Sequence, residues 1–128
     1  MATLKLIQEN EASEQVKESY EKVKERYQGN LPDIYKAFAN DPTYLASIND
    51  HLARVLAPRK VDAKTKEVIA FVVAVMNQCD FCIHAHARGL KRYGYDDEAI
   101  AEILGAVAAW SEVNRFNIGA RLQWPRER

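Results

Sequence analysis

The chain has 128 residues, of which 48% are hydrophobic, and its 18 basic residues balance 18 acidic ones. This length suffices for one domain with a single core, and we predict a single domain over residues 1–128. A balanced charge argues against a nucleic-acid-binding or membrane-surface protein, because those need a basic excess or patch. The basic ending Pro125-Arg126-Glu127-Arg128 is too short to change this and is predicted to be a solvated tail.

The N-terminus carries no targeting signal that we can identify. Residues 1–5 run into a charged segment without the apolar stretch of a signal peptide. The longest apolar stretch, Val68 to Met76, is about half as long as a membrane-spanning helix requires. We therefore expect a cytoplasmic protein. In that reducing compartment, two close cysteines are more often catalytic, redox-active or metal-binding than a structural disulfide.

The first half of the chain shows apolar residues at helical spacing. A first helix is predicted from Ala12 to Tyr27, ending at Gly29-Asn30, and residues 1–30 are interpreted as an N-terminal extension of the domain. A short second helix is expected from Asp33 to Ala39. The third helix ends before Pro58, and its apolar face consists of Leu45, Ile48, Leu52, Val55 and Leu56.

A fourth helix is predicted from Ala63 to about Asn77, with Asp62 as its N-cap. Beyond Glu67 this segment is apolar on nearly every side, so it must be covered all round. In so small a domain we expect a second subunit to provide part of that cover. Its β-branched residues leave a buried strand as the alternative. The preceding cap and the helical neighbours favour a helix.

The remaining segments are also predicted to be helical. A fifth helix runs from Cys79 to about Arg92, and Gly94 suits a left-handed terminus after it. The last helix follows the acidic stretch 96–98, and it contains small residues that allow another helix to approach closely, namely Gly105, Ala106, Ala108 and Ala109. Because no alternating strand pattern is present, the predicted fold class is all-α, a compact bundle of about six helices.

Cys79-Asp80-Phe81-Cys82 is the stretch with the sharpest chemical spacing. Residues three apart share a helix face. If Cys79 caps the helix and Cys82 lies in its first turn, both sulfurs lie near the positive end of the helix dipole, which favours thiolate, the nucleophilic form. His86 lies four residues beyond Cys82 on the same face, where it can give or take a proton. His84 lies about 200° round the helix from Cys82 and does not share that face.

Glu67 is a further candidate for the site. If its helix packs antiparallel to the next one, Glu67 lies beside the later turns of the cysteine helix, close to His86. A carboxylate hydrogen-bonded to an imidazole orients the ring and makes it a better base. The alternative, equally open from the residues alone, is that Glu67 belongs to a solvated first turn with Lys64 and Lys66.

These residues together resemble a known family signature. Glu67, eleven intervening residues, Cys79-x-x-Cys82, three residues and His86 follow the pattern of the alkylhydroperoxidase D-like (AhpD-like) proteins. These proteins form the thiol branch of the carboxymuconolactone decarboxylase superfamily. The flanking segments 66–69 (Lys-Glu-Val-Ile) and 97–104 (Asp-Glu-x-Ile-Ala-Glu-Ile-Leu) are similar too, and the resemblance covers residues 30–122.

The resemblance implies a compact all-helical fold that assembles through apolar helices into a homotrimer or homohexamer. It implies a dithiol peroxidase without a cofactor, in which Cys82 attacks a hydroperoxide and becomes a sulfenic acid, and Cys79 resolves it to a disulfide. Glu67 and His86 are then the proton relay that activates Cys82. The expected partners are a hydroperoxide substrate and a dithiol reductant, for which a lipoyl-type dithiol is one candidate.

One position departs from the family pattern. Phe81 stands where the best-studied members have a histidine immediately before the second cysteine. This departure bears on both the proton relay and the use of a lipoyl-type reductant. We expect Phe81 either to shield the site or to pack in the core.

Other functions of the cysteine pair stay open. A zinc site would use Cys79, Cys82 and His86 with His51 or His84 as the fourth ligand, but no second ligand pair at zinc spacing is present, and we predict no metal. A non-enzymatic oligomeric module that senses redox state would carry the pair without turnover. A decarboxylase-type enzyme of the sister branch works without the pair, so the pair counts against it.

Residues outside this site have structural interpretations. Trp110 and Trp124 are predicted to lie in the core or at an interface, as are the tyrosines of the first helix. His51 is expected at the surface or in a subunit contact. The polar residues among apolar neighbours in the last helix either satisfy buried groups or line a pocket, and they are Asn114, Arg115 and Asn117.

Overall fold

The computed structural model describes residues 2–124, and this part of the chain is helical, which confirms the predicted fold class. It contains six α-helices, one 3₁₀ turn and no strand. The chain divides into two compact units, residues 1–57 and 58–128, which we describe one by one. A single domain with residues 1–30 as an extension stays a prediction. The predicted solvated tail, residues 125–128, lies outside the described residues.

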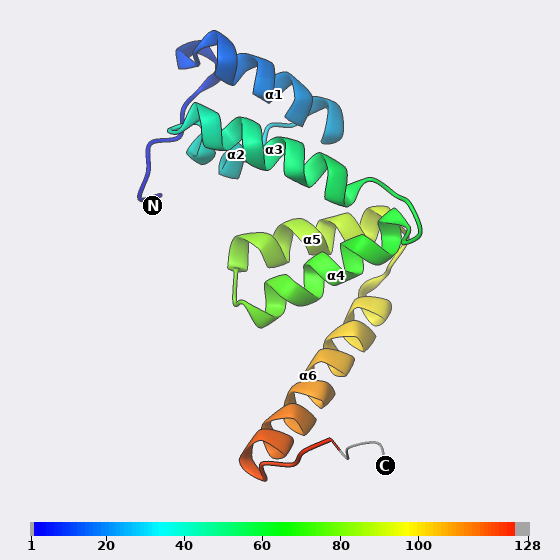
Figure 1. Cartoon of the computed structure of the whole chain (residues 1–128). Coiled ribbons are helices and arrows are strands. Elements are labelled where there is room, and N and C mark those ends of the chain that lie inside the picture. The colour runs from blue at the N-terminus through cyan, green and yellow to red at the C-terminus, as the bar shows by residue number, and fades with distance from the viewer. Residues whose placement is uncertain (1, 125–128) are drawn as a thin grey trace. The chain divides into compact units, whose positions relative to one another are not determined.

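The first unit contains the 3₁₀ turn Glu9–Glu11 and three helices, α1 (Glu14–Arg26), α2 (Asp33–Phe38) and α3 (Pro42–Leu56) (Figure 1). Helix α1 begins two residues later than predicted because Ser13 is its N-cap and accepts a hydrogen bond from the Val16 N–H. Helix α3 begins before its apolar face does, because Asp41 accepts from the Tyr44 N–H at 3.0 Å and Pro42 suits a first helical position.

The core of the first unit lies between α1, α2 and α3. Its largest side chains are buried almost completely, and they are Val16, Tyr20, Val23, Tyr35 and Leu45. The Tyr20 hydroxyl donates to the Ile7 carbonyl at 2.8 Å, which ties the N-terminal segment to α1. Asn49 is also buried, and its side chain donates to the Ser19 carbonyl at 3.3 Å. The tyrosine Tyr20 of the first helix is therefore a core residue, as one of its two predicted placements required.

The second unit contains α4 (Ala63–Met76), α5 (Asp80–Arg92) and α6 (Asp97–Gly119). The prediction that Asp62 caps α4 is confirmed, because its carboxylate accepts from the Thr65 N–H at 2.6 Å. That hydrogen bond holds the pKa of the Asp62 carboxyl below its usual range. Gly94 has φ +88°, which confirms the left-handed terminus predicted after α5.

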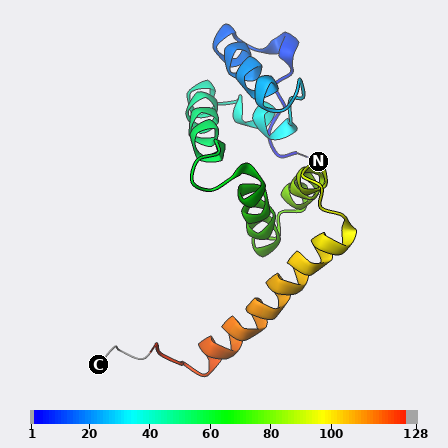
Figure 2. The ribbon, with the colours of Figure 1, turned by 90° about the vertical axis from the view of Figure 1, so that its right-hand side faces the viewer.

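Helices α4 and α5 form an antiparallel hairpin, and they lie side by side in both views of the ribbon (Figures 1 and 2). Phe71 and Ala74 are the buried residues of α4, and Gly89 and Leu90 are those of α5. The antiparallel arrangement brings the first turns of α4 beside the later turns of α5. This is the arrangement on which the predicted approach of Glu67 to the cysteine helix depends.

The second unit leaves much apolar surface exposed. No described residue of α6 is buried, and this helix continues well beyond the hairpin (Figure 2). One face of α4 is half exposed, and its residues are Ile69, Val73 and Met76. Trp110 and Trp124 are 66% and 90% exposed, so neither lies in the core, and their place at an interface stays a prediction. A single chain therefore covers only part of α4, and cover by a second subunit stays a prediction.

The helices α1 to α6 all lie within residues 2–124. None of these helices combines the length and the apolar character that crossing a bilayer requires. This includes α4, the most apolar helix by sequence, which has 14 residues.

Candidate functional site

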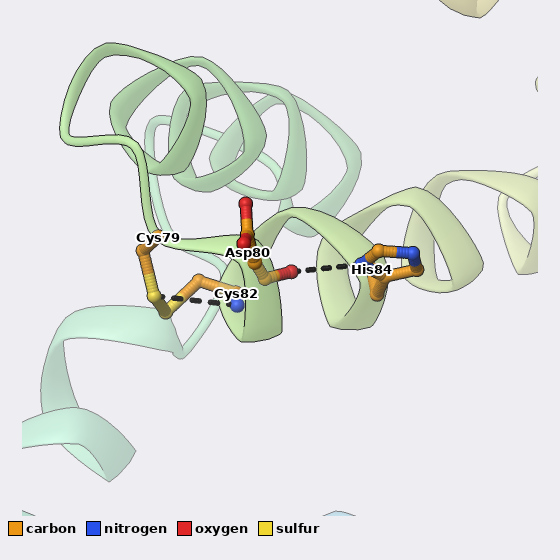
Figure 3. Close-up of a disulfide and its surroundings, with 4 residues drawn as sticks. All are labelled: Cys79, Asp80, Cys82 and His84. Atoms are coloured by element: carbon orange, nitrogen blue, oxygen red, sulfur yellow. Dashed lines mark hydrogen bonds between the residues drawn. A yellow bond between two sulfur atoms is a disulfide. The ribbon is translucent and has the colours of Figure 1, made fainter.

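Cys79 and Cys82 form a disulfide at the beginning of α5, with their Cα atoms 5.2 Å apart (Figure 3). Cys79 is the N-cap of the helix, and its sulfur accepts a hydrogen bond from the Cys82 N–H at 3.3 Å. The predicted positions of both cysteines, cap and first turn, are therefore confirmed. The unpaired N–H groups and the dipole of the helix end favour negative charge on sulfur at this place once the disulfide is reduced.

The turn before Cys79 fixes where its sulfur lies. The Gln78 N–H donates to the Val75 carbonyl at 3.1 Å, and the Cys79 N–H donates to the Ala74 carbonyl at 3.1 Å. These two bonds make a Schellman motif, which ends a helix with one residue in the left-handed conformation. Gln78 is that residue, with φ +55°. Cys79 therefore closes α4 with its N–H and opens α5 with its side chain.

The left-handed Gln78 leads to a stability prediction. Gln78→Gly is expected to raise the free energy of unfolding by about 0.5–1 kcal/mol, because glycine adopts positive φ without the steric penalty of a side chain. Urea denaturation of the two proteins measures the difference. Gln15→Gly is the matched control, because Gln15 is an exposed residue in the first turn of α1, where the same change should destabilise the protein by up to about 1 kcal/mol. Equal destabilisation by both changes would contradict the role given to the turn.

Glu67 and His86 meet across the hairpin. The Nδ1 atom of His86 lies 2.9 Å from Oε1 of Glu67, and the two side chains are 34% and 22% exposed. Glu67 therefore does not belong only to a solvated first turn, which was the alternative left open by the sequence. A carboxylate at Nδ1 favours the imidazole tautomer with its proton on that atom. Nε2 is then the nitrogen that can take a proton from another group.

Neither of the other two histidines takes part in the Glu67–His86 hydrogen bond. The Nδ1 atom of His84 lies 2.8 Å from the Asp80 carbonyl oxygen, and its ring lies along the helix away from the two sulfurs (Figure 3). This confirms that His84 does not share the face of Cys82. His51 is exposed on α3, in the first unit, as the surface prediction required.

Phe81 corrects one of its two predicted placements. Its side chain is 54% exposed, so it does not pack in the core. Phe81 lies in the first turn of α5, beyond the end of α4 at Met76. It is therefore exposed because α4 does not extend far enough to cover it. Shielding of the site by Phe81 stays a prediction.

Gly89 is a site residue that the sequence analysis did not identify. A Cβ atom added to it would lie 2.0 Å from Oε1 and 2.7 Å from Cδ of Glu67. The carboxylate thus occupies the volume in which any other residue would carry its side chain. The available signal was a glycine inside a predicted helix, three residues after His86, because an interior glycine lowers helix stability and usually has a packing or functional reason.

A shallow apolar groove of about 460 Å³ runs between α4 and α6. Val72 and Met76 line one side, and Trp110 and Asn114 line the other. Asn114 therefore lines a pocket, which was one of its two predicted roles. Among residues 2–124, no group of three or more histidine, cysteine, aspartate or glutamate side chains is arranged to hold a metal ion.

Comparison with known proteins places these residues in a wider context. Residues 42–126 match the sequence model described as the carboxymuconolactone decarboxylase family. A relative from Paracoccus denitrificans, named uncharacterized protein 4 in cox locus, is 39% identical over 83 residues, which are 62% of this chain and 75% of that protein. The crystal structure of the alkylhydroperoxidase AhpD core from Rhodospirillum rubrum matches 98% of this chain and 95% of its own, with a TM-score of 0.91 and 23% identity. The chain thus has the fold of that protein.

Proposed function

Because the chain belongs to the carboxymuconolactone decarboxylase family, and because its two cysteines are paired, we propose that it is a dithiol peroxidase that reduces hydroperoxides. The Cys79–Cys82 disulfide at the start of α5 is the observation that carries the proposal. The Glu67–His86 hydrogen bond, one helical turn further along, supports it. The solved structure with the same fold is that of an alkylhydroperoxidase core.

The reaction begins with the reduced pair. The Cys82 thiolate attacks one oxygen of the hydroperoxide ROOH, an S–O bond forms and the O–O bond breaks. The alkoxide leaves with a proton as the alcohol ROH, and Cys82 is oxidised to a sulfenic acid. Cys82 is the attacking residue because its place in the first turn of α5 puts it at the positive end of the helix and one turn from His86.

Cys79 completes the oxidation. Its thiolate attacks the sulfenic sulfur of Cys82, the S–S bond forms, and hydroxide leaves with a proton as water. An external dithiol then reopens the disulfide by thiol–disulfide exchange and is itself oxidised. A lipoyl-type dithiol is our candidate for this reductant.

Glu67 and His86 are the proton relay in this scheme. The Glu67 carboxylate accepts the Nδ1–H of His86 and fixes the ring. Nε2 takes the proton of the Cys82 thiol and returns it to the leaving alkoxide. Between these two steps the Glu67 carboxylate stabilises the positive charge of the protonated His86 ring.

Peroxide consumption tests the proposal directly. Reduced protein with an excess of dihydrolipoamide should consume tert-butyl hydroperoxide over many turnovers. The assay measures the remaining peroxide concentration over time. Protein alkylated with iodoacetamide before the assay is the control for peroxide lost to the reductant alone. If the disulfide opens and closes but no reductant supports turnover, the protein is a redox-sensing module rather than an enzyme.

We also propose that the chain forms a homo-oligomer, a trimer or a hexamer, through α4 and α6. The groove between these helices and the exposed stripe of α4 carry few polar atoms, and α6 leaves Trp110 and Phe116 exposed by 66% and 72%. Apolar surface of this extent is typical of an interface. A second copy fits it because each copy offers both a groove and an apolar helix.

Trp110→Asp is expected to convert the oligomer to monomers, because a carboxylate in an apolar interface loses its hydration without gaining a partner. Light scattering after size exclusion measures the mass of each protein. Glu112→Gln is the control, since Glu112 is an exposed polar residue of the same helix. A monomeric parent protein, or an unchanged mass after Trp110→Asp, would contradict this assembly.

A further inference from the structure

We propose that Gly89 is a positioning residue, which holds the Glu67 carboxylate on His86 by leaving room for it against α5. The proposal rests on the peroxidase function above, in which the Glu67–His86 pair is the relay. It adds a residue that carries no functional group. Its contribution is the absence of a side chain at one place in the site.

The geometry of three residues carries this inference. Gly89 is buried in the contact between α4 and α5, and it lies three residues after His86, on the neighbouring part of the same helix face. Oε1 of Glu67 is the atom nearest to the missing Cβ, at 2.0 Å, and the same Oε1 is the partner of His86 Nδ1 at 2.9 Å. One oxygen therefore depends on both residues for its place.

A methyl group at residue 89 changes the site more than the fold. The three heavy atoms nearest to the added Cβ all belong to the flexible side chain of Glu67, and none of them is a backbone atom of α4. The carboxylate can rotate away, and α4 and α5 need not separate. Alanine also favours the helix over glycine. Gly89→Ala is thus a folded protein in which Oε1 has lost its place on His86.

The competing explanation is that Gly89 only allows two helices to pack closely. The two explanations differ in their dependence on Glu67. If Gly89 acts through the carboxylate, a methyl group at residue 89 has no further effect once the carboxylate has been removed. If Gly89 serves helix packing, the effect of the methyl group persists.

The experiment is a double-mutant cycle of Gly89→Ala and Glu67→Ala. The rate at which the fully reduced protein reacts with tert-butyl hydroperoxide in a single turnover is measured for the parent, both single variants and the double variant. We expect each single variant to react about 10–100-fold more slowly, and the double variant to be no slower than Glu67→Ala. Losses that multiply in the double variant would overturn the inference.

Gly105→Ala is the matched control, because Gly105 also lies inside a helix and a Cβ there meets nothing within 4 Å. We expect it to react at the parent rate. Its mass is compared with that of the parent, since α6 is the helix proposed for assembly. Thermal unfolding followed by circular dichroism checks that Gly89→Ala folds.

Histidine ¹⁵N NMR separates a failure of this inference from a failure of the proposed function. The parent should show His86 with its proton on Nδ1, and both Gly89→Ala and Glu67→Ala should lose that signature while Gly105→Ala keeps it. These spectra decide the role of Gly89 even if the parent does not reduce peroxide. An unchanged His86 spectrum in Gly89→Ala would overturn the inference whatever the activity.

Discussion

Cys82→Ser is expected to abolish peroxide reduction, with a loss of about 10³-fold or more, because a serine hydroxyl at neutral pH is not an effective nucleophile toward peroxide. Cys82 occupies the first turn of α5, where the helix end favours its thiolate, and it has the imidazole of His86 one turn away. The chain has only one other cysteine, Cys79, and its proposed role is to resolve the sulfenic acid rather than to attack the peroxide. Stopped-flow measurement of the reaction between reduced protein and peroxide gives the rate.

Cys79→Ser is the matched control for this prediction. It replaces the sulfur of the other cysteine by oxygen in the same way. It also keeps the N-cap of α5, because serine is a good capping residue. This variant should still react once with peroxide, gain one oxygen at Cys82 and then stop. The opposite result, one turnover in Cys82→Ser and none in Cys79→Ser, would exchange the roles of the two cysteines.

Glu67→Gln is expected to slow the reaction with peroxide about 10–100-fold while leaving the reduced protein folded. Glutamine keeps the shape of the side chain but has no charge with which to stabilise a protonated imidazole. It can also present its amide group instead of its oxygen to Nδ1, which favours the wrong tautomer. Single-turnover rates of the two proteins measure the loss.

Two further variants test whether the slower reaction of Glu67→Gln comes from loss of the relay. Glu102→Gln makes the same change at an exposed position of α6 and should leave the rate unchanged. The rate of the His86→Gln variant should fall about as far as the rate of the double variant Glu67→Gln/His86→Gln, because the two residues act as a unit. A Glu67→Gln variant that reacts as fast as the parent would remove the carboxylate from the relay and leave the 2.9 Å contact with a structural role.

Local chemistry explains why much of the fold was predictable. Asp62 and Cys79 are the N-caps they were expected to be, and Gly94 has the left-handed conformation expected after α5. These features depend on a few neighbouring residues, and the sequence displays them directly. The helices themselves follow from apolar residues repeated at helical spacing, so their existence was predicted better than their first residues.

The site was predictable where helix geometry sufficed and open where packing decided. Spacing alone placed Cys82 and His86 on one face and His84 elsewhere. The partner of Glu67 depended on how α4 and α5 pack, which no local pattern settles. Gly89 was missed for the same reason, since only the packed hairpin shows that Oε1 of Glu67 fills its empty side-chain volume.

The sequence did not show which surface covers each apolar residue of α4. The hydrophobic pattern of α4 required cover on every side, but Phe71 and Ala74 are its buried residues, while Ile69 and Val73 stay half exposed. A sequence pattern reports that a side chain avoids water, but it does not say whether the cover comes from the same chain.

The most direct test of the account is the mass of the reduced protein after one equivalent of hydroperoxide. We predict a loss of two hydrogens, the disappearance of both titratable thiols and a Cys79–Cys82 bond in the peptide map, with one equivalent of alcohol released. Peroxide that remains unconsumed while both thiols stay titratable would contradict the proposed dithiol cycle.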